Sequence, residues 1–167
     1  FDPVKALEVI QRDGATTFEG VPTMYGAMLA ADASQRTTPQ LPSLRSRVPG
    51  CASMPLALMR GCVKLFVFTI LEVYGLSETS PVASFNHPDK ERKAGPIGTP
   101  IEGVRMRCVD PEGNDVAPGE VGEIVIAGDN IMRGYWNRPE ASAEAIRDGW
   151  FHSGDLGRID EDGYFSI

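Results

Sequence analysis

Four consecutive polar residues, Ser77, Glu78, Thr79 and Ser80, follow a segment that we predict to be a buried strand. In an α/β sheet, ligands bind in the crevice beyond the carboxyl ends of the strands. One carboxylate among three hydroxyls suits Mg²⁺ and phosphate oxygens, because the carboxylate holds the hard cation while hydroxyls or backbone N–H groups meet the anion. The alternative is a helix N-cap, in which Ser or Thr with a nearby Glu closes the first turn.

A second acidic residue with useful chemistry is Asp155, which ends the segment GWFHSGD (Gly149–Asp155). A carboxylate fixed beside a glycine can accept two hydrogen bonds from a ribose diol, and such charge-assisted bonds are stronger than neutral ones. An Asp in this setting also caps turns. The residues alone leave both interpretations open.

The elements that must position these residues differ between the two halves of the chain. In residues 1–92, helix and strand signals alternate. Asp2 is predicted to cap a helix that begins at Pro3 and ends near Gly14, and Pro22 opens a second helix. A third helix is predicted from Pro55, and strands are predicted at residues 16–18, 45–48 and 68–73. This alternation indicates part of a helix-flanked parallel or mixed sheet.

Residues 93–167 have the pattern of antiparallel β structure. Strands are predicted at residues 104–109, 121–127, 157–160 and 164–167, and a short helix is predicted from Pro139. The turn at Asp162-Gly163 is a strong hairpin signal. The predicted fold class is therefore α/β plus β, with an antiparallel, barrel-like β unit after the α/β unit.

Three segments in this order resemble the motifs of the adenylate-forming superfamily, and the AMP-forming acyl–CoA synthetases (fatty-acid–CoA ligases) in particular. They are YGLSETSP (Tyr74–Pro81), GEIVIAGDNIMRGYW (Gly122–Trp136) and GWFHSGDLGRIDEDGYF (Gly149–Phe165). FEGVPTMY (Phe18–Tyr25) and GCASMP (Gly50–Pro55) also match upstream segments of that family. The resemblance covers nearly the whole chain.

The resemblance implies roles for the matching positions. Tyr74 would stack on adenine, with Gly75 beside it. Thr79 would contact the α-phosphate and Glu78 would coordinate Mg²⁺, so these two are the predicted catalytic residues. Asp155 would bind the ribose hydroxyls.

Weaker assignments follow from the remaining matches. Gly50, Cys51 and Ala52 would also line the nucleotide site. Tyr25 would face the acyl chain, although its spacing equally suits a buried helix face. Gly98 would lie near the acyl carbonyl and the pantetheine path, although its loop could need a glycine for its own conformation.

Two positions depart from the family pattern, which has glycine where Val73 and Cys51 stand here. Glycine lets the backbone approach a ligand closely, and a Val side chain adds bulk. We therefore expect weakened or altered nucleotide binding.

The activity that the resemblance implies is a two-step ligation. ATP and a carboxylic acid give acyl-AMP and pyrophosphate, and the thiol of CoA then displaces AMP to form a thioester. ATP or AMP, Mg²⁺ and CoA are the implied cofactors and co-substrates. The family also carries an upstream phosphate loop and a C-terminal lid domain with a lysine, which this sequence does not contain. We therefore expect an internal fragment that does not catalyse alone.

Alternative functions stay open at this stage. Another adenylate-forming enzyme, luciferase-like or loading a carrier protein, would share these motifs. A non-catalytic relic of the fold is the rival from a different class, and it would form a homodimer by pairing exposed sheet edges.

Composition excludes several classes. The formal net charge is -7 and no Lys/Arg run exceeds two residues, so a nucleic-acid surface is not expected. The three cysteines form no CxxC pair and indicate free thiols in a cytoplasmic protein. No apolar run approaches the roughly 20 residues that span a bilayer. His87 and His152 are too few for a zinc cluster, and we predict no catalytic role for either.

Overall fold

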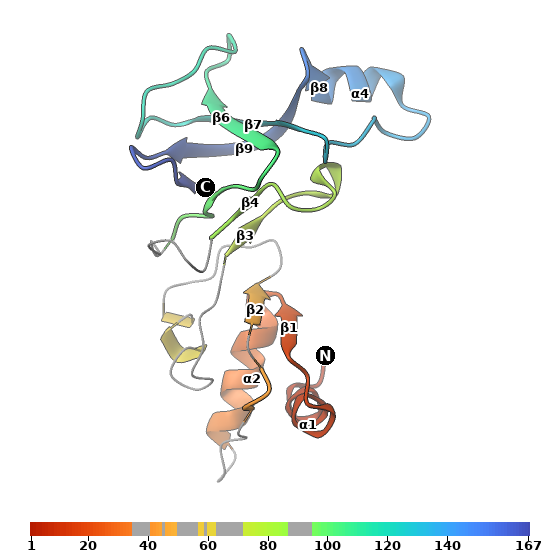
Figure 1. Ribbon diagram of the computed structural model, residues 1–167, viewed down its shortest axis with the longest axis vertical. Helices are drawn as coiled ribbons and strands as arrows, with labels where there is room; N and C mark the ends of the chain where they lie inside the picture. The colour runs from red at the N-terminus through yellow and green to blue at the C-terminus, as the bar shows by residue number, and fades with distance from the viewer. Residues whose placement is uncertain (35–40, 45, 50–56, 59, 63–71, 87–94) are drawn as a thin grey trace. The chain divides into compact units, whose positions relative to one another are not determined.

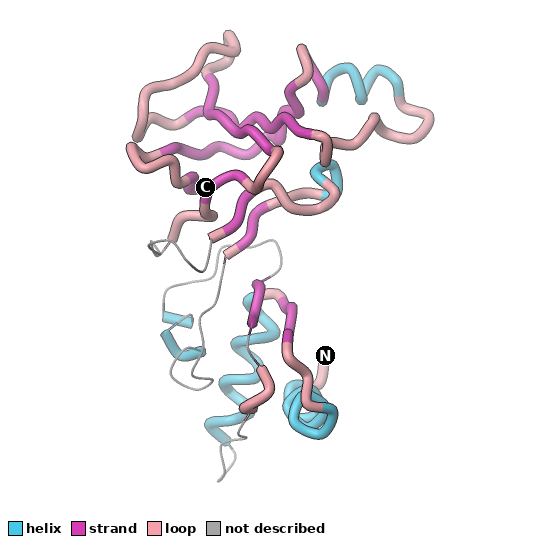
Figure 2. The backbone as a smooth tube through the Cα atoms, in the orientation of Figure 1, coloured by secondary structure: helices cyan, strands magenta, loops and turns pink. Residues whose placement is uncertain are grey.

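The computed structural model describes residues 1–34, 41–44, 46–49, 57–58, 60–62, 72–86 and 95–167. They form two compact units, Phe1–Glu72 (the first unit) and Val73–Ile167 (the second unit). Figure 1 shows helices beside a small sheet in the first unit and a curled antiparallel sheet in the second, and Figure 2 shows the same elements by type. The predicted fold class is confirmed.

The first helix has the predicted ends. Helix α1 spans Pro3–Asp13, and the Asp2 side chain accepts a hydrogen bond from the Lys5 N–H at 3.1 Å. Gly14 follows with φ of 62°, a left-handed conformation that glycine adopts without steric cost. Leu7 and Ile10, one helical turn apart, are buried on one face of α1.

The rest of the first unit has a strand–helix–strand arrangement. Strand β1 (Thr17–Gly20) pairs in parallel with β2 (Ser46–Pro49), and α2 (Pro22–Ser34) lies between them in the chain. Parallel neighbours need such a crossover connection. The unit buries the apolar residues Leu7, Ile10, Tyr25, Met28, Leu41, Leu44 and Cys62. Residues 68–71 of the predicted strand 68–73, and much of the predicted third helix, lie outside the described residues.

The second unit begins with a small antiparallel sheet. Strands β3 (Val73–Tyr74), β4 (Ser84–Phe85) and β5 (Thr99–Pro100) pair in that order, and the 3₁₀ turn η1 (Ser77–Thr79) lies between the first two. These strands belong to the second unit, so the division at residues 72/73 lies earlier than the predicted 92/93. The physical reason is the pairing of β4 with β5, which ties residues 73–85 to the chain that follows them.

The larger sheet of the second unit is antiparallel, in the order β10-β9-β7-β6. Its strands are β6 (Val104–Val109), β7 (Gly122–Gly128), β9 (Trp150–Ile159) and β10 (Phe165–Ser166), and β8 (Ile146–Arg147) pairs with the start of β9. Helix α4 (Pro139–Ala145) begins at the predicted proline. The strands and turns predicted from alternation are present, but β9 begins earlier than predicted and β8 was not predicted.

The two faces of this sheet differ in chemistry. Side chains alternate between faces along a strand, and one face contributes Met106, Cys108, Ile124, Ile126 and Phe151 to the core of the second unit. On the other face, the guanidinium carbons of Arg105 and Arg107 lie 5.0 Å and 4.3 Å from the centre of the Trp150 ring. The second face is therefore polar and cationic beside an aromatic residue.

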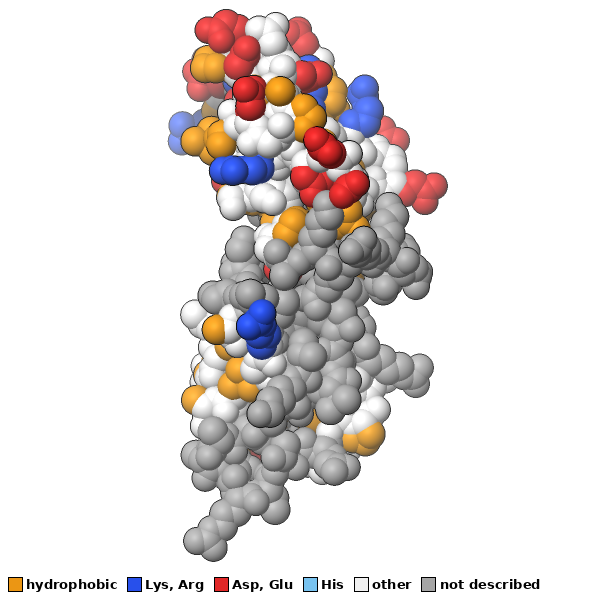
Figure 3. Space-filling view, turned by 90° about the vertical axis from the view of Figure 1, so that its left-hand side faces the viewer, with side chains coloured by type: hydrophobic (Ala, Val, Ile, Leu, Met, Phe, Trp, Pro, Cys, Tyr) orange, Lys and Arg blue, Asp and Glu red, His pale blue; other side chains and the backbone are white. Residues whose placement is uncertain are grey.

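The surface of the second unit is mixed in charge. On the face shown in Figure 3, acidic, basic and apolar side chains of its described residues are interspersed. None of the helices described here has the length and apolar character needed to cross a membrane.

Gly98 is needed for packing in this fold. It has φ of 91°, and an added Cβ would overlap the backbone of Phe85. Its carbonyl accepts the Phe165 N–H at 2.9 Å, which joins the small sheet to β10. The structure thus supplies the conformational reason for this glycine, and its predicted place near the substrate stays a prediction.

We expect Gly98→Ala to destabilise the second unit far more than Gly103→Ala. Gly103 has a similar φ of 80° but open space around the Cβ position, so its substitution costs only the left-handed conformation, about 1–2 kcal/mol. Urea unfolding of both variants measures the difference. Equal losses would show that the close approach to Phe85 carries no cost.

Candidate functional site

The segment Tyr74–Val82, called here the acidic loop, is closed by its own threonine. The Thr79 Oγ1 atom accepts the Leu76 N–H at 2.9 Å, and it lies 2.9 Å from the carbonyl oxygens of both Leu76 and Pro81, either of which can take its proton. The Thr79 side chain is 0% exposed. These contacts fix the turn η1 and leave this hydroxyl no surface for a ligand.

The Thr79 hydroxyl is thus used within the loop, and its predicted contact with the α-phosphate stays a prediction. The alternative weighed from the sequence, a capping residue, describes its contacts better, although it caps a 3₁₀ turn. The exposed hydroxyls of the acidic loop are those of Ser77 and Ser80. Residue types alone do not show the burial of Thr79 or its hydrogen bonds within the loop.

Gly75 brings the two ends of the acidic loop together. A Cβ at this position would overlap the carbonyl oxygen of Pro81. The Ala83 N–H donates to the Tyr74 carbonyl at 2.8 Å, which closes the loop next to this contact. Gly75 is thus required by the backbone packing of the loop, whatever else approaches it.

The segment after β7 holds the acidic loop from outside. The Asn130 Nδ2 atom donates to the carbonyl oxygens of Thr79 and Val82, both at 2.9 Å, and the Met132 N–H donates to the Glu78 carbonyl at 2.8 Å. The Asn130 Oδ1 atom is buried without a partner among the described residues. The amide of Asn130 therefore serves the loop through its two N–H donors.

The Glu78 carboxylate is oriented by a tyrosine from the same segment. The Tyr135 hydroxyl donates to Glu78 Oε1 at 2.8 Å. This hydrogen bond to a carboxylate raises the pKa of Tyr135 above its usual value, so the hydroxyl keeps its proton. The described residues provide no donor to Oε2, which is left for a ligand.

Tyr74 and Asp155 are joined in a similar way. The Tyr74 hydroxyl donates to Asp155 Oδ2 at 2.7 Å, across 81 positions of sequence. Burial first, and this hydrogen bond second, raise the pKa of Tyr74 well above its usual value, so it remains a donor at neutral pH. The described part of the chain offers no donor to the Oδ1 atom of Asp155, which is half-buried.

Asp155 lies at the end of a bulge in β9. Val125 of β7 faces His152 and Glu123 faces Leu156, so the segment Ser153–Asp155 lies opposite Ile124 alone. Gly154 takes a φ of 76° within this segment. Extra residues bend a strand locally. The last residue of this bulge, Asp155, contacts Tyr74.

The backbone of the bulge is satisfied by nearby side chains. The Ser153 hydroxyl donates to the Ile124 carbonyl at 2.6 Å and accepts the Asp155 N–H at 3.1 Å. Glu123 accepts the Gly154 N–H at 3.1 Å, and its other oxygen lies 2.8 Å from His152 Nδ1. Residues near His152 in the chain do not indicate this contact, because Glu123 lies 29 positions away.

Burial and pairing act in opposite directions on Glu123. Burial raises the pKa of its carboxyl, but hydrogen bonds from His152 and Gly154 and the nearby Arg147 outweigh burial, so the net pKa lies below the usual value. Glu123 is therefore ionised at neutral pH and is a strong acceptor for the bulge.

The other residues predicted for the site include Tyr25 of the first unit and Val73 of the second unit. Tyr25 is fully buried in the core of the first unit, where its hydroxyl donates to the Phe18 carbonyl at 3.2 Å and its ring packs edge-on against Phe18. Val73 is buried on β3, next in the strand to Tyr74 and hence on the opposite side. Its predicted effect on nucleotide binding stays a prediction. Gly50, Cys51 and Ala52 lie outside the described residues.

The second unit thus holds two carboxylates in the same way. Each has one oxygen held by a tyrosine hydroxyl and the other without a donor among the described residues. Such carboxylates can accept hydrogen bonds from a diol or bind a cation. A match to the AMP-binding enzyme family covers residues 1–136, most of the chain.

The chain belongs to the AMP-binding enzyme family.

Individual members of this family are similar to the whole chain. A feruloyl-CoA synthase from Amycolatopsis sp is 41% identical over 100% of this chain and 34% of its own length, and a long-chain-fatty-acid–CoA ligase from Bacillus subtilis (strain 168) is 38% identical over 100% and 30%. The crystal structure of the anthranilate CoA ligase AuaEII in complex with anthranoyl-AMP matches with a TM-score of 0.90 and 30% identity, over 98% of this chain and 31% of that one. The chain spans about a third of the length of these relatives.

The contacts of Asn130 predict its contribution to this AMP-binding fold. Asn130→Ala removes the donors to the Thr79 and Val82 carbonyls, and we expect it to lower the free energy of unfolding by about 2 kcal/mol. The control is Asn114→Ala, which removes contacts to Asp110 on an exposed turn and should cost under about 1 kcal/mol. Urea unfolding measures both, and an Asn130 variant as stable as the control would contradict this account of the loop.

Proposed function

We propose that this chain supplies part of the nucleotide site of a ligase that activates a carboxylic acid with ATP and transfers the acyl group to CoA. The observation that carries the proposal is the pair of tyrosine-held carboxylates at two family motifs, Glu78 in the acidic loop and Asp155 in the bulge. Sequence relatives with CoA ligase names and a structural relative with bound anthranoyl-AMP support it.

The ribose is assigned to Asp155. Its Oδ2 atom is occupied by the Tyr74 hydroxyl, and Oδ1 is left to accept from a ribose hydroxyl. The Tyr74 ring is itself largely buried, so adenine would meet its edge or its remaining exposed surface. Tyr74 has two functions in this proposal, because it contacts the base and also fixes the carboxylate that holds the sugar.

The phosphate end of the nucleotide is assigned to the acidic loop. Glu78 Oε2 is a suitable ligand for Mg²⁺, a cation that proteins hold through one or two carboxylates together with the phosphates of the substrate. Bound there, Mg²⁺ would offset phosphate charge. The exposed hydroxyls of Ser77 and Ser80 can donate to phosphate oxygens, whereas Thr79 is committed to the loop.

The proposed reaction balances in two displacements. A carboxylate oxygen of the acid attacks the α-phosphorus of ATP, which forms acyl-AMP as the bond to pyrophosphate breaks. The CoA thiol then loses its proton to solvent as its sulfur attacks the acyl carbon, the thioester forms, and the bond from the acyl carbon to the AMP oxygen breaks to release AMP. The relatives are named for feruloyl and long-chain fatty acids, so we propose a hydrophobic carboxylic acid as substrate. A fatty acid, the substrate expected from the resemblance of the motif at residues 74–81, belongs to that class.

Calorimetric titration of ATP into the protein tests this assignment. We expect Asp155→Ala to weaken ATP binding at least about tenfold, because a charge-assisted hydrogen bond contributes about 1.5–3 kcal/mol. Asp129→Ala is the matched control, since Asp129 is exposed on the turn after β7. Unchanged affinity in the Asp155 variant would contradict the assigned ribose contact.

A further inference from the structure

Asp155, which contacts Tyr74, is the last residue of the segment in which β9 leaves its regular pairing. A bulge breaks ladder hydrogen bonds, and each N–H group freed in this way needs another partner. Ser153 provides one internal partner, through the 3.1 Å contact of its hydroxyl with the Asp155 N–H. The Gly154 N–H has its partner outside the bulge, in the carboxylate of Glu123.

Glu123 contacts both the middle of the bulge and the residue before it. One oxygen accepts the Gly154 N–H at 3.1 Å, and the other lies 2.8 Å from Nδ1 of His152, the residue just before the bulge. Glu123 comes from β7, the strand that the bulge faces. A single side chain therefore spans the irregular part of the strand.

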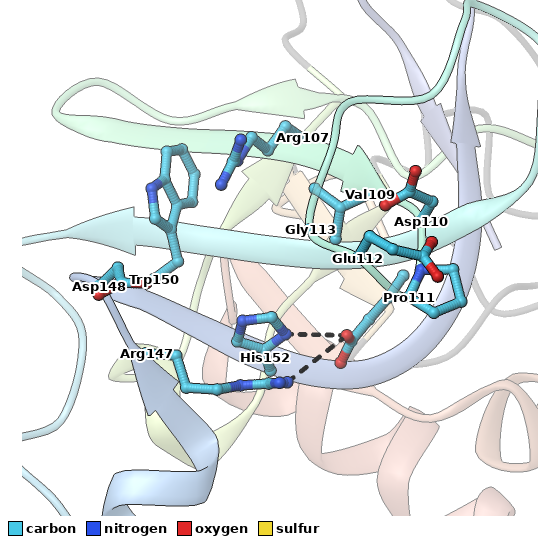
Figure 4. Close-up of a pocket in the computed structure, with 11 residues that line it drawn as sticks. Arg107, Val109, Asp110, Pro111, Glu112, Gly113, Arg147, Asp148, Trp150 and His152 are labelled. Atoms are coloured by element: carbon cyan, nitrogen blue, oxygen red, sulfur yellow. Dashed lines mark hydrogen bonds and ion pairs between the residues drawn. The ribbon is translucent and has the colours of Figure 1, made fainter.

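The surroundings of Glu123 also favour a specific role. Figure 4 shows His152 and Arg147 directed at one carboxylate, and the Arg147 guanidinium lies 4.0 Å from Glu123 Oε2. Asp110, Glu112, Asp148 and Arg107 line the same pocket of about 230 Å³. An exposed ion pair contributes little to stability, but Glu123 is only 27% exposed in its side chain and it accepts from a backbone N–H.

We propose that Glu123 is a positioning residue for the ribose-binding carboxylate of Asp155, acting through the bulge Ser153–Asp155. This inference rests on the proposed function, in which Asp155 accepts from the ribose. Glu123 and His152 lie on the polar face of the sheet, and Asp155 points to Tyr74 of the core cluster. The effect of Glu123 thus crosses the sheet through the backbone of Gly154, without contact between Glu123 and the nucleotide.

The test compares ATP with 2′,3′-dideoxy-ATP, which lacks both ribose hydroxyls. The dissociation constant of 2′,3′-dideoxy-ATP divided by that of ATP, both measured by calorimetry, isolates the ribose contact from all other binding. We expect Asp155→Ala to reduce this ratio about tenfold, and Glu123→Ala to reduce it at least about threefold, a smaller effect because Asp155 itself is retained. Glu112→Ala removes another carboxylate of the same pocket and should leave the ratio unchanged.

Two substitutions of Glu123 separate reach from charge. Glu123→Gln keeps the length and the acceptor for the Gly154 N–H, so the ratio should stay close to that of the unsubstituted protein. Glu123→Asp keeps the charge but is too short to contact both His152 and Gly154, so the ratio should fall as it does in Glu123→Ala. This comparison also decides the matter if Glu123→Ala fails to fold.

The outcomes distinguish the two proposals. If Asp155→Ala leaves the ratio unchanged, the ribose assignment fails. If Asp155→Ala reduces the ratio but Glu123→Ala does not, only the positioning role fails. A greater loss in the Gln variant than in the Asp variant would likewise overturn the role, because charge and not reach would then be decisive.

Discussion

The hydrogen bond from the Tyr74 hydroxyl to Asp155 joins the acidic loop to the bulge of β9. Different parts of the fold hold the two partners: Tyr74 is fixed by its short strand and by burial, and Asp155 ends the bulge of β9. Because the bond ties residues far apart in the chain, it depends on correct pairing of β7 with β9. The candidate site therefore requires the complete second unit.

The second carboxylate, that of Glu78, is also held by a tyrosine hydroxyl from a distant part of the chain. Glu78 is fixed at its backbone by Met132 and at its side chain by Tyr135, and both belong to the segment that follows β7. Asn130 from this segment also closes the acidic loop. One connection thus supports the whole loop, and the carboxylate oxygens not used in these contacts are those proposed for ligands. Pre-organised polar groups of this kind bind without a large cost of ordering.

The sequence predicted the local features of this structure well and the long-range ones poorly. The ends of α1, the extent of β6 and the hairpin turn at Asp162-Gly163 depend on nearby residues, through caps, alternation and turn chemistry. The burial of Thr79 depends on how the loop folds back on itself. Residue types suggested a phosphate ligand there, but the hydrogen bonds assign that threonine to the loop.

Local sequence patterns likewise did not predict the contacts across the sheet. Nothing near His152 in the chain indicates Glu123, and only the register of β7 against β9 brings them together. β5 and β8 have two residues each, too short for an alternation signal. The resemblance to known motifs singled out Tyr74, Glu78 and Asp155, but it indicated neither the contact of Tyr74 with Asp155 nor that of Tyr135 with Glu78.

The central claim is that the Tyr74–Asp155 pair forms a ribose site. A crystal structure of the protein with bound AMP tests it most directly, through the distance from the ribose hydroxyls to the Asp155 carboxylate. We expect a ribose hydroxyl within hydrogen-bonding distance of Oδ1 while Tyr74 still donates to Oδ2. AMP bound with its ribose away from Asp155 would contradict it.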